Sequence, residues 1–462
     1  MVMTTSLQAT SPLEKWLCYI EQSHGKIIDM GLERVKRVAA ELALLQPAPF
    51  VITVGGTNGK GTTCRLLEML LLNAGYRVGV YSSPHLLRYN ERVRIQNQEL
   101  PDSAHSAAFY FLDQHKSESL SYFEFSTLSA LYLFKQAQLD VVILEVGLGG
   151  RLDATNIVDS DISVITSIDI DHVDYLGDNR EQIGYEKAGI FRAGKRAVIG
   201  EPDLPLSVIE HAAQIGCELF RRDKEWSYSE QAQSWQWQSH SEKNIDKSAV
   251  WQHLPLPQIP LANAATALAV CACLPFRISA DTVLKTLTEV ELSGRFQTIQ
   301  PSQLQILAAR WQLPLAKFPQ VIVDVGHNPH AARYLAQKLR QLKTQAGKLQ
   351  RHLKVTAVFA MLKDKDAGHV VEPLAGLIDQ WHFATLDCYR GQRGEQLQSA
   401  VADYLTPPQQ QTAKTASSVT LAVKTALSEM QQDELLLIFG SFFTVAEFLA
   451  LLAEQNVKRK AV

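Results

Sequence analysis

The stretch VITVGGTNGKGTT, Val51–Thr63, sets the organisation of this chain. Its first residues, Val51–Val54, form a short apolar run of the kind that builds a buried parallel strand. Glycines follow, and the amphipathic stretch Cys64–Ala74 then predicts a helix that ends at Gly75. A strand, a glycine-rich loop and a helix in this order indicate a phosphate site, because backbone N–H groups and the helix N-terminus attract anions.

Lys60 adds a full positive charge at the entry of this helix. Thr62 or Thr63 can offer a hydroxyl to a magnesium ion. The strict pattern GxxxxGK[ST] is not met, because Val54 and Gly61 stand where it has a glycine and a Ser or Thr. The alternative is a glycine-rich turn without a ligand. A lysine at the helix entry after a buried strand favours the nucleotide site.

Length and composition narrow the classes of protein. At 462 residues the chain is long for a single hydrophobic core, so we expect two or three domains. Its composition, with 46% hydrophobic and 20% charged residues, is ordinary for a soluble globular protein. The net charge of −3 and the lack of a basic stripe argue against nucleic acid and acidic membranes as partners. There is no signal peptide pattern and no apolar run of membrane-spanning length, and the six cysteines are scattered. We therefore expect a cytoplasmic protein, and a monomer.

Two further predicted strands end in polar residues that suit a ligand site. Arg77–Tyr81 leads into Ser83, and Ile162–Ile168 leads into His172. Polar residues beyond the carboxyl ends of parallel strands lie where open α/β sheets bind ligands. Either segment alone is better explained as a turn or loop.

Glu145 places a carboxylate inside the apolar strand Asp140–Val146. Burying a carboxylate is costly unless it is paired or bound to a metal. Glu145 is therefore a candidate magnesium ligand or water-positioning acid, and the alternative is a structural pair with Arg151. With Ser83 and His172 it could surround one ion.

The second half of the chain again alternates strands and helices, at Val321–Asp324, Val355–Met361, Gln380–Ala384 and Glu434–Phe439. The proline- and glutamine-rich Pro407–Ser418 is expected to be a surface loop. Tryptophans that alternate with polar residues in Arg221–Pro260 suggest antiparallel strands or a flap. We predict an α/β fold with a P-loop-containing, mainly parallel sheet domain at residues 1–294 and a smaller Rossmann-like α/β domain at 295–462.

A set of motifs resembles the family of bacterial bifunctional dihydrofolate synthases/folylpolyglutamate synthases, within the Mur ligase superfamily. The motifs are GTNGKGT at Gly56–Thr62, SSPHL at Ser82–Leu86, EVGLGGRLDATN at Glu145–Asn156, EKAGIF at Glu186–Phe191 and HNPH at His327–His330. The resemblance covers nearly the whole chain, and the Glu145–Asn156 string is its most specific part.

This resemblance implies an ATP-dependent ligase that adds L-glutamate to dihydropteroate, forming dihydrofolate, and to the glutamate tail of reduced folates. ATP would phosphorylate the acceptor carboxylate, and the glutamate amine would attack the acyl phosphate. Phosphorylation supplies the leaving group that a carboxylate lacks, and the charge of the transferred group needs Lys60, backbone N–H groups and Mg²⁺. The implied partners are these small molecules alone.

The resemblance also assigns roles to residues, with Lys60, Lys187 and His172 as the catalytic set. Lys187 matches a lysine that is carbamylated in the family. The ATP site matches Gly56, Thr57, Asn58, Gly59, Lys60, Gly61, Thr62, Asn263, Arg295 and Asp324. The pteroate pocket matches Asp29, Tyr122, Phe123, Glu124, Leu152, Asp153 and Ala154. The metal ligands match Ser83, Glu145 and His172.

Three rival functions remain from the residues alone. A cell-wall Mur ligase shares GTNGKGT, but the Glu145–Asn156 string favours folate. A P-loop GTPase or kinase would leave the second α/β domain unexplained, and the GTPase motif NKxD is absent. A nucleotide-binding protein without catalysis would not need Lys60, Glu145, His172 and Lys187 together.

Overall fold

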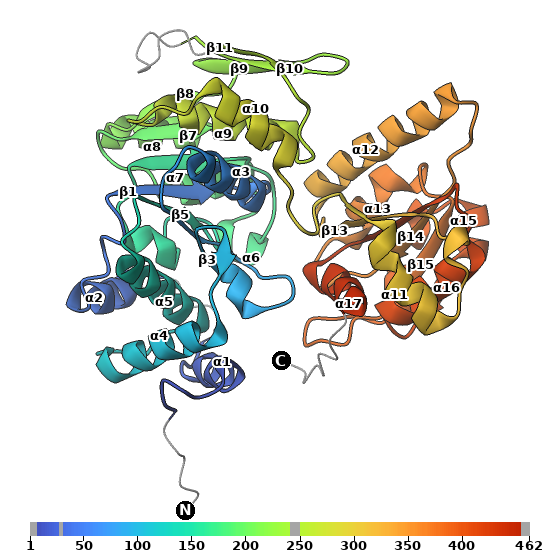
Figure 1. Cartoon of the computed structure of the whole chain (residues 1–462), viewed down its shortest axis with the longest axis horizontal. Helices are drawn as coiled ribbons and strands as arrows, with labels where there is room; N and C mark the ends of the chain where they lie inside the picture. Colours follow the sequence, from blue (N-terminus) through green and yellow to red (C-terminus); the bar gives the residue numbers. More distant parts are fainter. Residues whose placement is uncertain (1–6, 27–30, 241–249, 454–462) are drawn as a thin grey trace, which may run out of the picture. The chain divides into compact units, whose positions relative to one another are not determined.

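The computed structural model describes residues 7–26, 31–240 and 250–453. The chain divides into two compact units, Met1–Glu291 and Leu292–Val462 (Figure 1). The predicted boundary, 294/295, stands close to this division. Within the described residues no helix has the length and apolar character needed to cross a membrane.

Unit 1 is built on an eight-stranded sheet of order β4-β3-β2-β5-β1-β6-β7-β8. Its strands are β1 (Phe50–Gly55), β2 (Val78–Tyr81), β3 (Val93–Ile95), β4 (Gln98–Glu99), β5 (Val141–Glu145), β6 (Ile162–Ile165), β7 (Arg196–Ile199) and β8 (Glu218–Arg221). Strands β2 and β5–β8 run parallel to β1, and β3 and β4 form an antiparallel edge. Val54 of β1 lies opposite Glu145 of β5, so the loop after β1 begins beside this carboxylate. The predicted mainly parallel sheet is confirmed.

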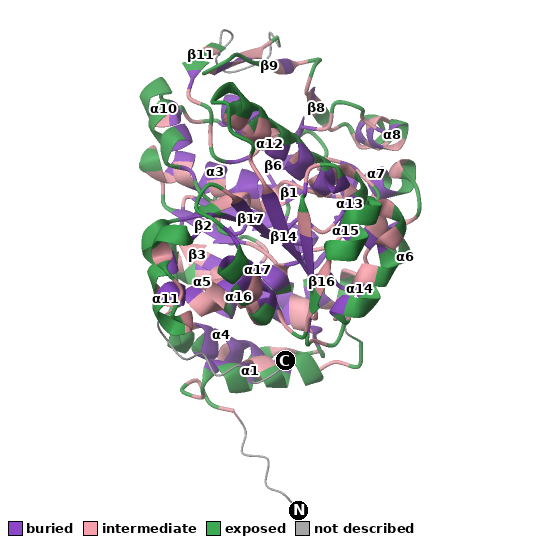
Figure 2. Cartoon of the chain, turned by 90° about the vertical axis from the view of Figure 1, so that its right-hand side faces the viewer, coloured by how far each residue is buried: buried purple, intermediate pink, exposed green. Residues whose placement is uncertain are grey.

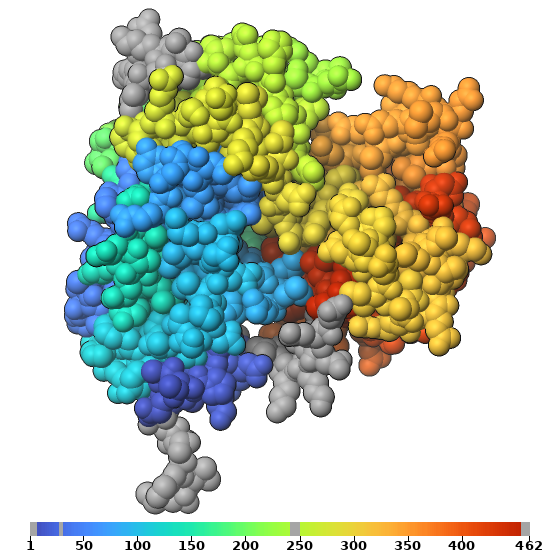
Figure 3. All heavy atoms as spheres, viewed as in Figure 1, coloured from blue at the N-terminus to red at the C-terminus, as the bar shows by residue number. Residues whose placement is uncertain are grey.

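Helices cover both faces of this sheet. They are α1 (Leu13–Gln22), α2 (Glu33–Glu41), α3 (Lys60–Asn73), α4 (Asp102–His115), α5 (Tyr122–Ala137), α6 (Val173–Leu176), α7 (Arg180–Ala188), α8 (Leu206–Ile215), α9 (Leu261–Cys273) and α10 (Ala280–Glu289), with 3₁₀ turns η1 (Tyr89–Arg92) and η2 (Ala154–Ile157). Successive residues of β1 point to opposite faces of the sheet and belong to two separate hydrophobic clusters. Ile52 and Val54 pack with α3, α9 and α10, while Val51 packs with α1, α2, α4 and α5 on the other face. Trp16 of α1 contacts Phe109 of α4, and the dark blue atoms of α1 lie against α4 in Figure 3.

A small antiparallel sheet carries the tryptophans of the segment Arg221–Pro260. Its strands are β9 (Trp226–Glu230), β10 (Trp235–Ser239) and β11 (Val250–Leu254), in the order β11-β10-β9. Trp226, Trp235 and Trp237 are fully buried and join the core that contains α9. The alternation of tryptophan with polar residues therefore marks antiparallel strands, with one face buried.

Unit 2 is a second parallel sheet of order β12-β13-β17-β14-β15-β16, in which only β12 runs antiparallel to its neighbour. The strands are β12 (Gln297–Ile299), β13 (Gln320–Asp324), β14 (Val355–Phe359), β15 (Gln380–Ala384), β16 (Lys414–Ala416) and β17 (Leu435–Phe439). The helices are α11 (Pro301–Trp311), α12 (Pro329–Lys348), α13 (Ala367–Ala375), α14 (Gly394–Ala400), α15 (Pro407–Thr412), α16 (Val419–Glu429) and α17 (Phe442–Leu452), with η3 (Leu315–Lys317) and η4 (Ala402–Tyr404). The central strands β14 and β17, like β1 in unit 1, are buried (Figure 2).

The expected surface loop Pro407–Ser418 is wrong. This segment forms helix α15 and edge strand β16, which pairs with β15. The Gln409 side chain caps the helix start and donates to the carbonyl oxygens of Ala375 and Ile378 over 2.6 and 2.7 Å. Long-range bonds of this kind outweigh a composition typical of loops.

Candidate active site

The phosphate loop follows β1 and enters α3 at Lys60. Gly56 and Gly59 have φ of 146° and 87°, which favour glycine. A Cβ on Gly56 would lie 1.9 Å from Thr166 Oγ1, so the loop is packed closely against the end of β6. Thr57 and Asn58 donate their N–H groups to Ser167, over 2.8 and 3.0 Å. The N–H groups left for an anion are those of the first turn of α3, which have no partner within the helix.

Lys60 and Thr62 lie on this first turn. Lys60 Nζ donates to the carbonyl oxygens of Gly56 and Thr57 over 3.0 and 3.5 Å, so the ammonium lies over the loop. Asn263, at the start of α9, donates to Thr62 Oγ1 over 2.6 Å. The structure thus brings together the predicted loop residues and Asn263, which is 201 residues away in sequence from Thr62.

Glu145 ends β5 next to this loop and is buried, with 5% of its surface exposed. Ser83 donates its backbone N–H to Glu145 Oε2 over 3.4 Å, so two of the expected metal ligands lie together. Arg151 pairs with Glu186 over 2.8 Å, which excludes the alternative in which it pairs with Glu145. A buried carboxylate beside a serine suits a hard divalent cation.

His172, the third expected metal ligand, precedes helix α6. It adopts a left-handed backbone with φ of 53°, and its side chain is 41% exposed. Nε2 lies 4.0 Å from Asp171 Oδ2. In the part of the chain that the structure describes, no three His, Cys, Asp or Glu side chains gather to hold a metal. A site here would therefore rely on the Ser83 hydroxyl as well as on Glu145 and His172.

Lys187 lies in the last turn of α7 and is 3% exposed. Burial and the nearby charge of Lys60 lower its pKa to about 7, although Asp171 acts to raise it. Its sequence neighbour Glu186 pairs with Arg151 and not with Lys187. A buried lysine with a lowered pKa is a candidate reactive amine.

Two of the expected pteroate residues, Phe123 and Asp153, lie against the loop after β5. Phe123, in the first turn of α5, packs so closely on Gly147 that a Cβ there would lie 2.5 Å from the ring. Asp153 is buried and accepts from the N–H groups of Leu148 and Thr155, over 2.8 and 3.0 Å. Burial raises the pKa of the Asp153 carboxyl, and these hydrogen bonds act against the shift.

The other pteroate-side residues have differing environments. Glu124 caps α5 by accepting from Ser121 N–H and also pairs with Arg34, over 2.7 and 2.8 Å, so its carboxylate has structural partners. Tyr122 precedes Phe123 in the chain, and Leu152 and Ala154 stand on either side of Asp153 in sequence. Asp29 lies outside the described residues.

The sequence reasoning missed two arginines, Arg92 and Arg94. Arg92 is buried and lies over the rings of Tyr122 and Tyr89, at 5.4 and 5.8 Å. It donates to His85 Nδ1 over 2.8 Å, and burial together with Arg92 lowers the pKa of His85 to about 4. The signal was the alternation RVRI at Arg92–Ile95, which the segment Leu87–Glu91 separates from the SSPHL motif.

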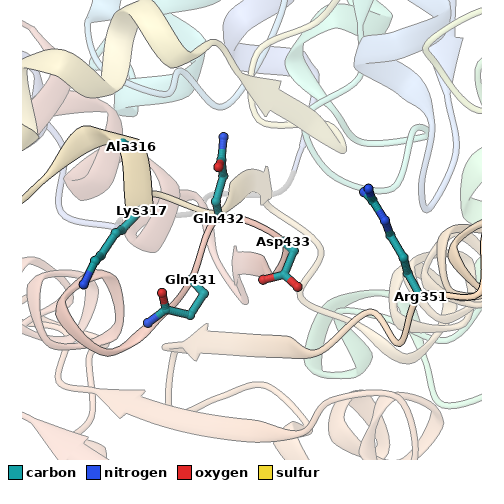
Figure 4. Close-up of a pocket in the computed structure, with 6 residues that line it drawn as sticks. All are labelled: Ala316, Lys317, Arg351, Gln431, Gln432 and Asp433. Carbon is teal, nitrogen blue, oxygen red and sulfur yellow. The ribbon is translucent and has the colours of Figure 1, made fainter.

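Arg295 and Asp324, which the resemblance assigns to the ATP site, both lie in unit 2. Asp324 ends β13, is 6% exposed, and accepts from the N–H groups of Phe296 and Gly326 over 2.7 and 2.6 Å. Burial raises the pKa of Asp324, and Arg295 acts to lower it, so the two side chains are neighbours. The Asp324 carboxylate therefore also has a structural role, because it holds the backbone on both sides of it. A pocket of unit 2 lies at the amino ends of β13, β14 and β17, whereas Asp324 lies at the carboxyl end of β13 (Figure 4). The pocket is lined by Ala316, Lys317, Arg351, Gln431, Gln432 and Asp433.

The fold and motif order define a Mur-type ligase. The model of the Mur ligase middle domain matches residues 54–274, and that of the Mur ligase glutamate ligase domain matches residues 309–442. The dihydrofolate synthase/folylpolyglutamate synthase of Haemophilus influenzae is 58% identical over 96% of this chain and 98% of its own length. The chain belongs to the dihydrofolate synthase/folylpolyglutamate synthase family.

Solved structures agree with this assignment. E. coli FolC in complex with DHPP and ADP has a TM-score of 0.87 at 46% identity, over 97% of this chain and 99% of its own. A bifunctional folylpolyglutamate synthase/dihydrofolate synthase with Mn, AMPPNP and L-glutamate bound has a TM-score of 0.84 at 48% identity, over 96% and 99%. The predicted fold class and family are confirmed.

Proposed function

We propose that this chain is an ATP-dependent ligase that adds L-glutamate to dihydropteroate, forming dihydrofolate, and to the glutamate tail of reduced folates. The phosphate loop between β1 and α3, in a chain of this family, carries the proposal. The acceptor carboxylate attacks the γ-phosphorus of ATP and ADP leaves. The amine of L-glutamate then attacks the acyl phosphate, and phosphate departs as the amide forms. Phosphorylation is needed because a carboxylate is a poor acceptor for an amine.

Lys60 and the first turn of α3 bind the phosphates in this mechanism. The ammonium and the N–H groups of Gly61 and Thr62 face the charge that spreads over the transferred phosphoryl group. Asn263, Arg295 and Asp324 are assigned to the nucleotide. Tyr122, Phe123 and Asp153 are assigned to the pterin side, where Arg92 lies buried over the Tyr122 ring.

Ser83, Glu145 and His172 are the residues assigned to Mg²⁺. A carboxylate, a hydroxyl and an imidazole form a donor set that accepts a divalent cation. A bound cation supplies charge neutralisation at the phosphates. The buried Glu145 carboxylate beside Ser83 N–H supports this assignment.

Lys187 is assigned a carbamate. Its pKa of about 7 leaves a large neutral fraction, and the neutral amine attacks carbon dioxide and loses a proton. The product is an anion with two oxygens, which replaces a cation that would repel Mg²⁺.

We place the reaction in the cytoplasm and in a monomer. The free thiols of the described structure support a reducing compartment.

The test is ADP release with Mg²⁺, L-glutamate and one of three acceptors: dihydropteroate, a reduced folate or a UDP-muramoyl substrate. We expect turnover with the first two alone. Lys60→Ala should lower turnover by about a hundredfold or more while the protein stays folded. Lys195→Ala is the matched control, because Lys195 pairs with Asp161 at the exposed surface. Turnover with the muramoyl acceptor alone, or normal turnover by Lys60→Ala, would contradict the proposal.

A further inference from the structure

A fully buried carboxylate on α3 has no role in the mechanism above. Glu68 lies two turns beyond Lys60 on this helix, and none of its surface is exposed. Arg94 of β3 donates to Glu68 Oε2 through Nε and Nη2, over 3.1 and 2.9 Å. Arg65 Nη1 donates to the same oxygen over 3.0 Å. Two guanidinium groups thus hold one carboxylate in the middle of the helix that follows the phosphate loop.

The remaining nitrogen of Arg94 turns toward the expected metal loop. Nη1 donates to Ser82 Oγ over 3.3 Å and to the carbonyl oxygen of Glu91 over 3.2 Å. Ser82 directly precedes Ser83, whose N–H donates to Glu145 Oε2 over 3.4 Å. Hydrogen bonds on either side of the Ser82–Ser83 peptide bond therefore connect the phosphate-loop helix to Glu145.

The carboxylate of Glu91 holds the loop that follows Ser83 through hydrogen bonds to its backbone. The Glu91 carboxylate accepts from the N–H groups of Leu86, Leu87 and Arg88, over 2.6, 2.6 and 2.7 Å. Ser82 N–H donates to the carbonyl oxygen of Arg92 over 2.9 Å. Arg94 thus contacts the start of a loop whose later residues are fixed by Glu91.

Stability alone is a poor explanation for the Arg94–Glu68 pair. A buried ion pair often contributes no more stability than apolar residues of the same volume, because both charges lose their hydration. An arginine does fix the relative positions of its partners, because two nitrogens of its planar guanidinium bond a carboxylate while the third bonds another group at a set angle. Lysine carries the same charge but lacks this planar fork of nitrogens.

We propose that Arg94, oriented by Glu68, is a positioning residue that sets Ser82 and Ser83 against Glu145 and so determines the affinity of the site for a divalent cation. This inference rests on the proposed function, in which Ser83 and Glu145 hold the cation. Arg94 itself touches neither substrate nor cation.

The test compares three variants of the full chain with the wild type. Arg94→Lys keeps the charge and loses the fork, and Ser82→Ala removes only the accepting hydroxyl. Arg221→Lys is the control, because Arg221 pairs with Glu225 over 2.7 Å in a partly buried site on β8. The readouts are Mn²⁺ affinity by electron paramagnetic resonance in the presence of AMPPNP, melting temperature, and the KM values for metal and dihydropteroate.

We expect Arg94→Lys to weaken Mn²⁺ binding by about tenfold, and Ser82→Ala by about threefold or more. The KM for metal should rise in parallel, the KM for dihydropteroate should change by less than about twofold, and Arg221→Lys should bind Mn²⁺ like the wild type. Wild-type Mn²⁺ affinity in Ser82→Ala would overturn the inference, whether or not Arg94→Lys folds. A wild-type protein without Mn²⁺ binding or ADP release would overturn the proposed function itself.

Discussion

Asn263 Nδ2 donates a 2.6 Å hydrogen bond to Thr62 Oγ1, which in turn donates to the carbonyl oxygen of Gly59 over 2.9 Å. Helix α9 therefore supports the phosphate loop from the side. The fit is close, because a Cβ on Gly59 would lie 2.4 Å from Asn263 Oδ1. A residue expected to contact the nucleotide is thus also part of the loop's own packing.

This contact predicts that two substitutions of Asn263 weaken ATP binding to different degrees. Asn263→Ala should raise the KM for ATP by about tenfold, through loss of one hydrogen bond. Asn263→Asp keeps the shape but places a negative charge beside the phosphates, so it should bind ATP more weakly than the alanine variant. ATP titration with a fluorescent analogue, and KM from ADP release, measure both. Equal affinities for the aspartate variant and the wild type would show that no phosphate approaches this side of the loop.

A second prediction is that both glutamate additions use one active site. The described residues contain one phosphate loop, and Glu145 lies beside it at the end of β5. Glu145→Gln keeps the volume and removes the charge, so it should lower turnover with dihydropteroate and with a reduced folate alike, by about a hundredfold each. ADP release is measured with each acceptor in turn. Survival of one activity at its normal rate would require a second site.

The periodicity of the strands was sufficient to predict the fold, because buried parallel strands are continuous apolar runs. Val51–Val54 and Val321–Asp324 follow this rule, and Glu145 stands out because it interrupts such a run. Pro407–Ser418 was wrong for a physical reason. Its helix and strand depend on Gln409 bonding to residues about 30 positions earlier, and a local composition carries no record of that.

The side-chain partners in the site could not be predicted in the same way. Arg151 follows Glu145 closely in sequence, yet it pairs with Glu186. Arg94 was overlooked because its partner Glu68 lies on α3, and only the register of β3 beside β2 brings them together. The strand ends were predictable, but the choice among nearby charges depends on side-chain geometry.

A third prediction concerns stability in acid. His105 is fully buried on α4, and within the described structure neither of its ring nitrogens has a hydrogen-bond partner. Burial lowers its pKa from 6.5 to about 4, so between these values the unfolded chain binds a proton that the folded chain does not. The contribution of a neutral His105 to stability is therefore present above pH 6.5 and lost as the pH falls toward 4, by at most about 3 kcal/mol.

His105→Phe removes this titration and keeps an aromatic ring against Tyr89, whose ring lies 5.2 Å away. The free energy of unfolding of this variant should depend less steeply on pH between 6.5 and 4 than that of the wild type. Urea unfolding at a series of pH values measures the two slopes. Identical slopes would mean that His105 gains its proton without disturbing the fold.

The last prediction concerns Lys187, whose pKa is about 7 because of its burial and the charge of Lys60. Only the neutral amine reacts with carbon dioxide, so in CO₂-depleted buffer activity should fall, and more steeply below pH 7 than above it. Added bicarbonate should restore it. Lys187→Ala should be nearly inactive and partly rescued by acetate, whose carboxylate replaces the carbamate oxygens. Lys187→Arg should fail without rescue, because its guanidinium stays positive and fills the space. ADP release across magnesium and bicarbonate concentrations measures each case. Full activity in Lys187→Arg would exclude the carbamate as a requirement, because that side chain cannot carry one.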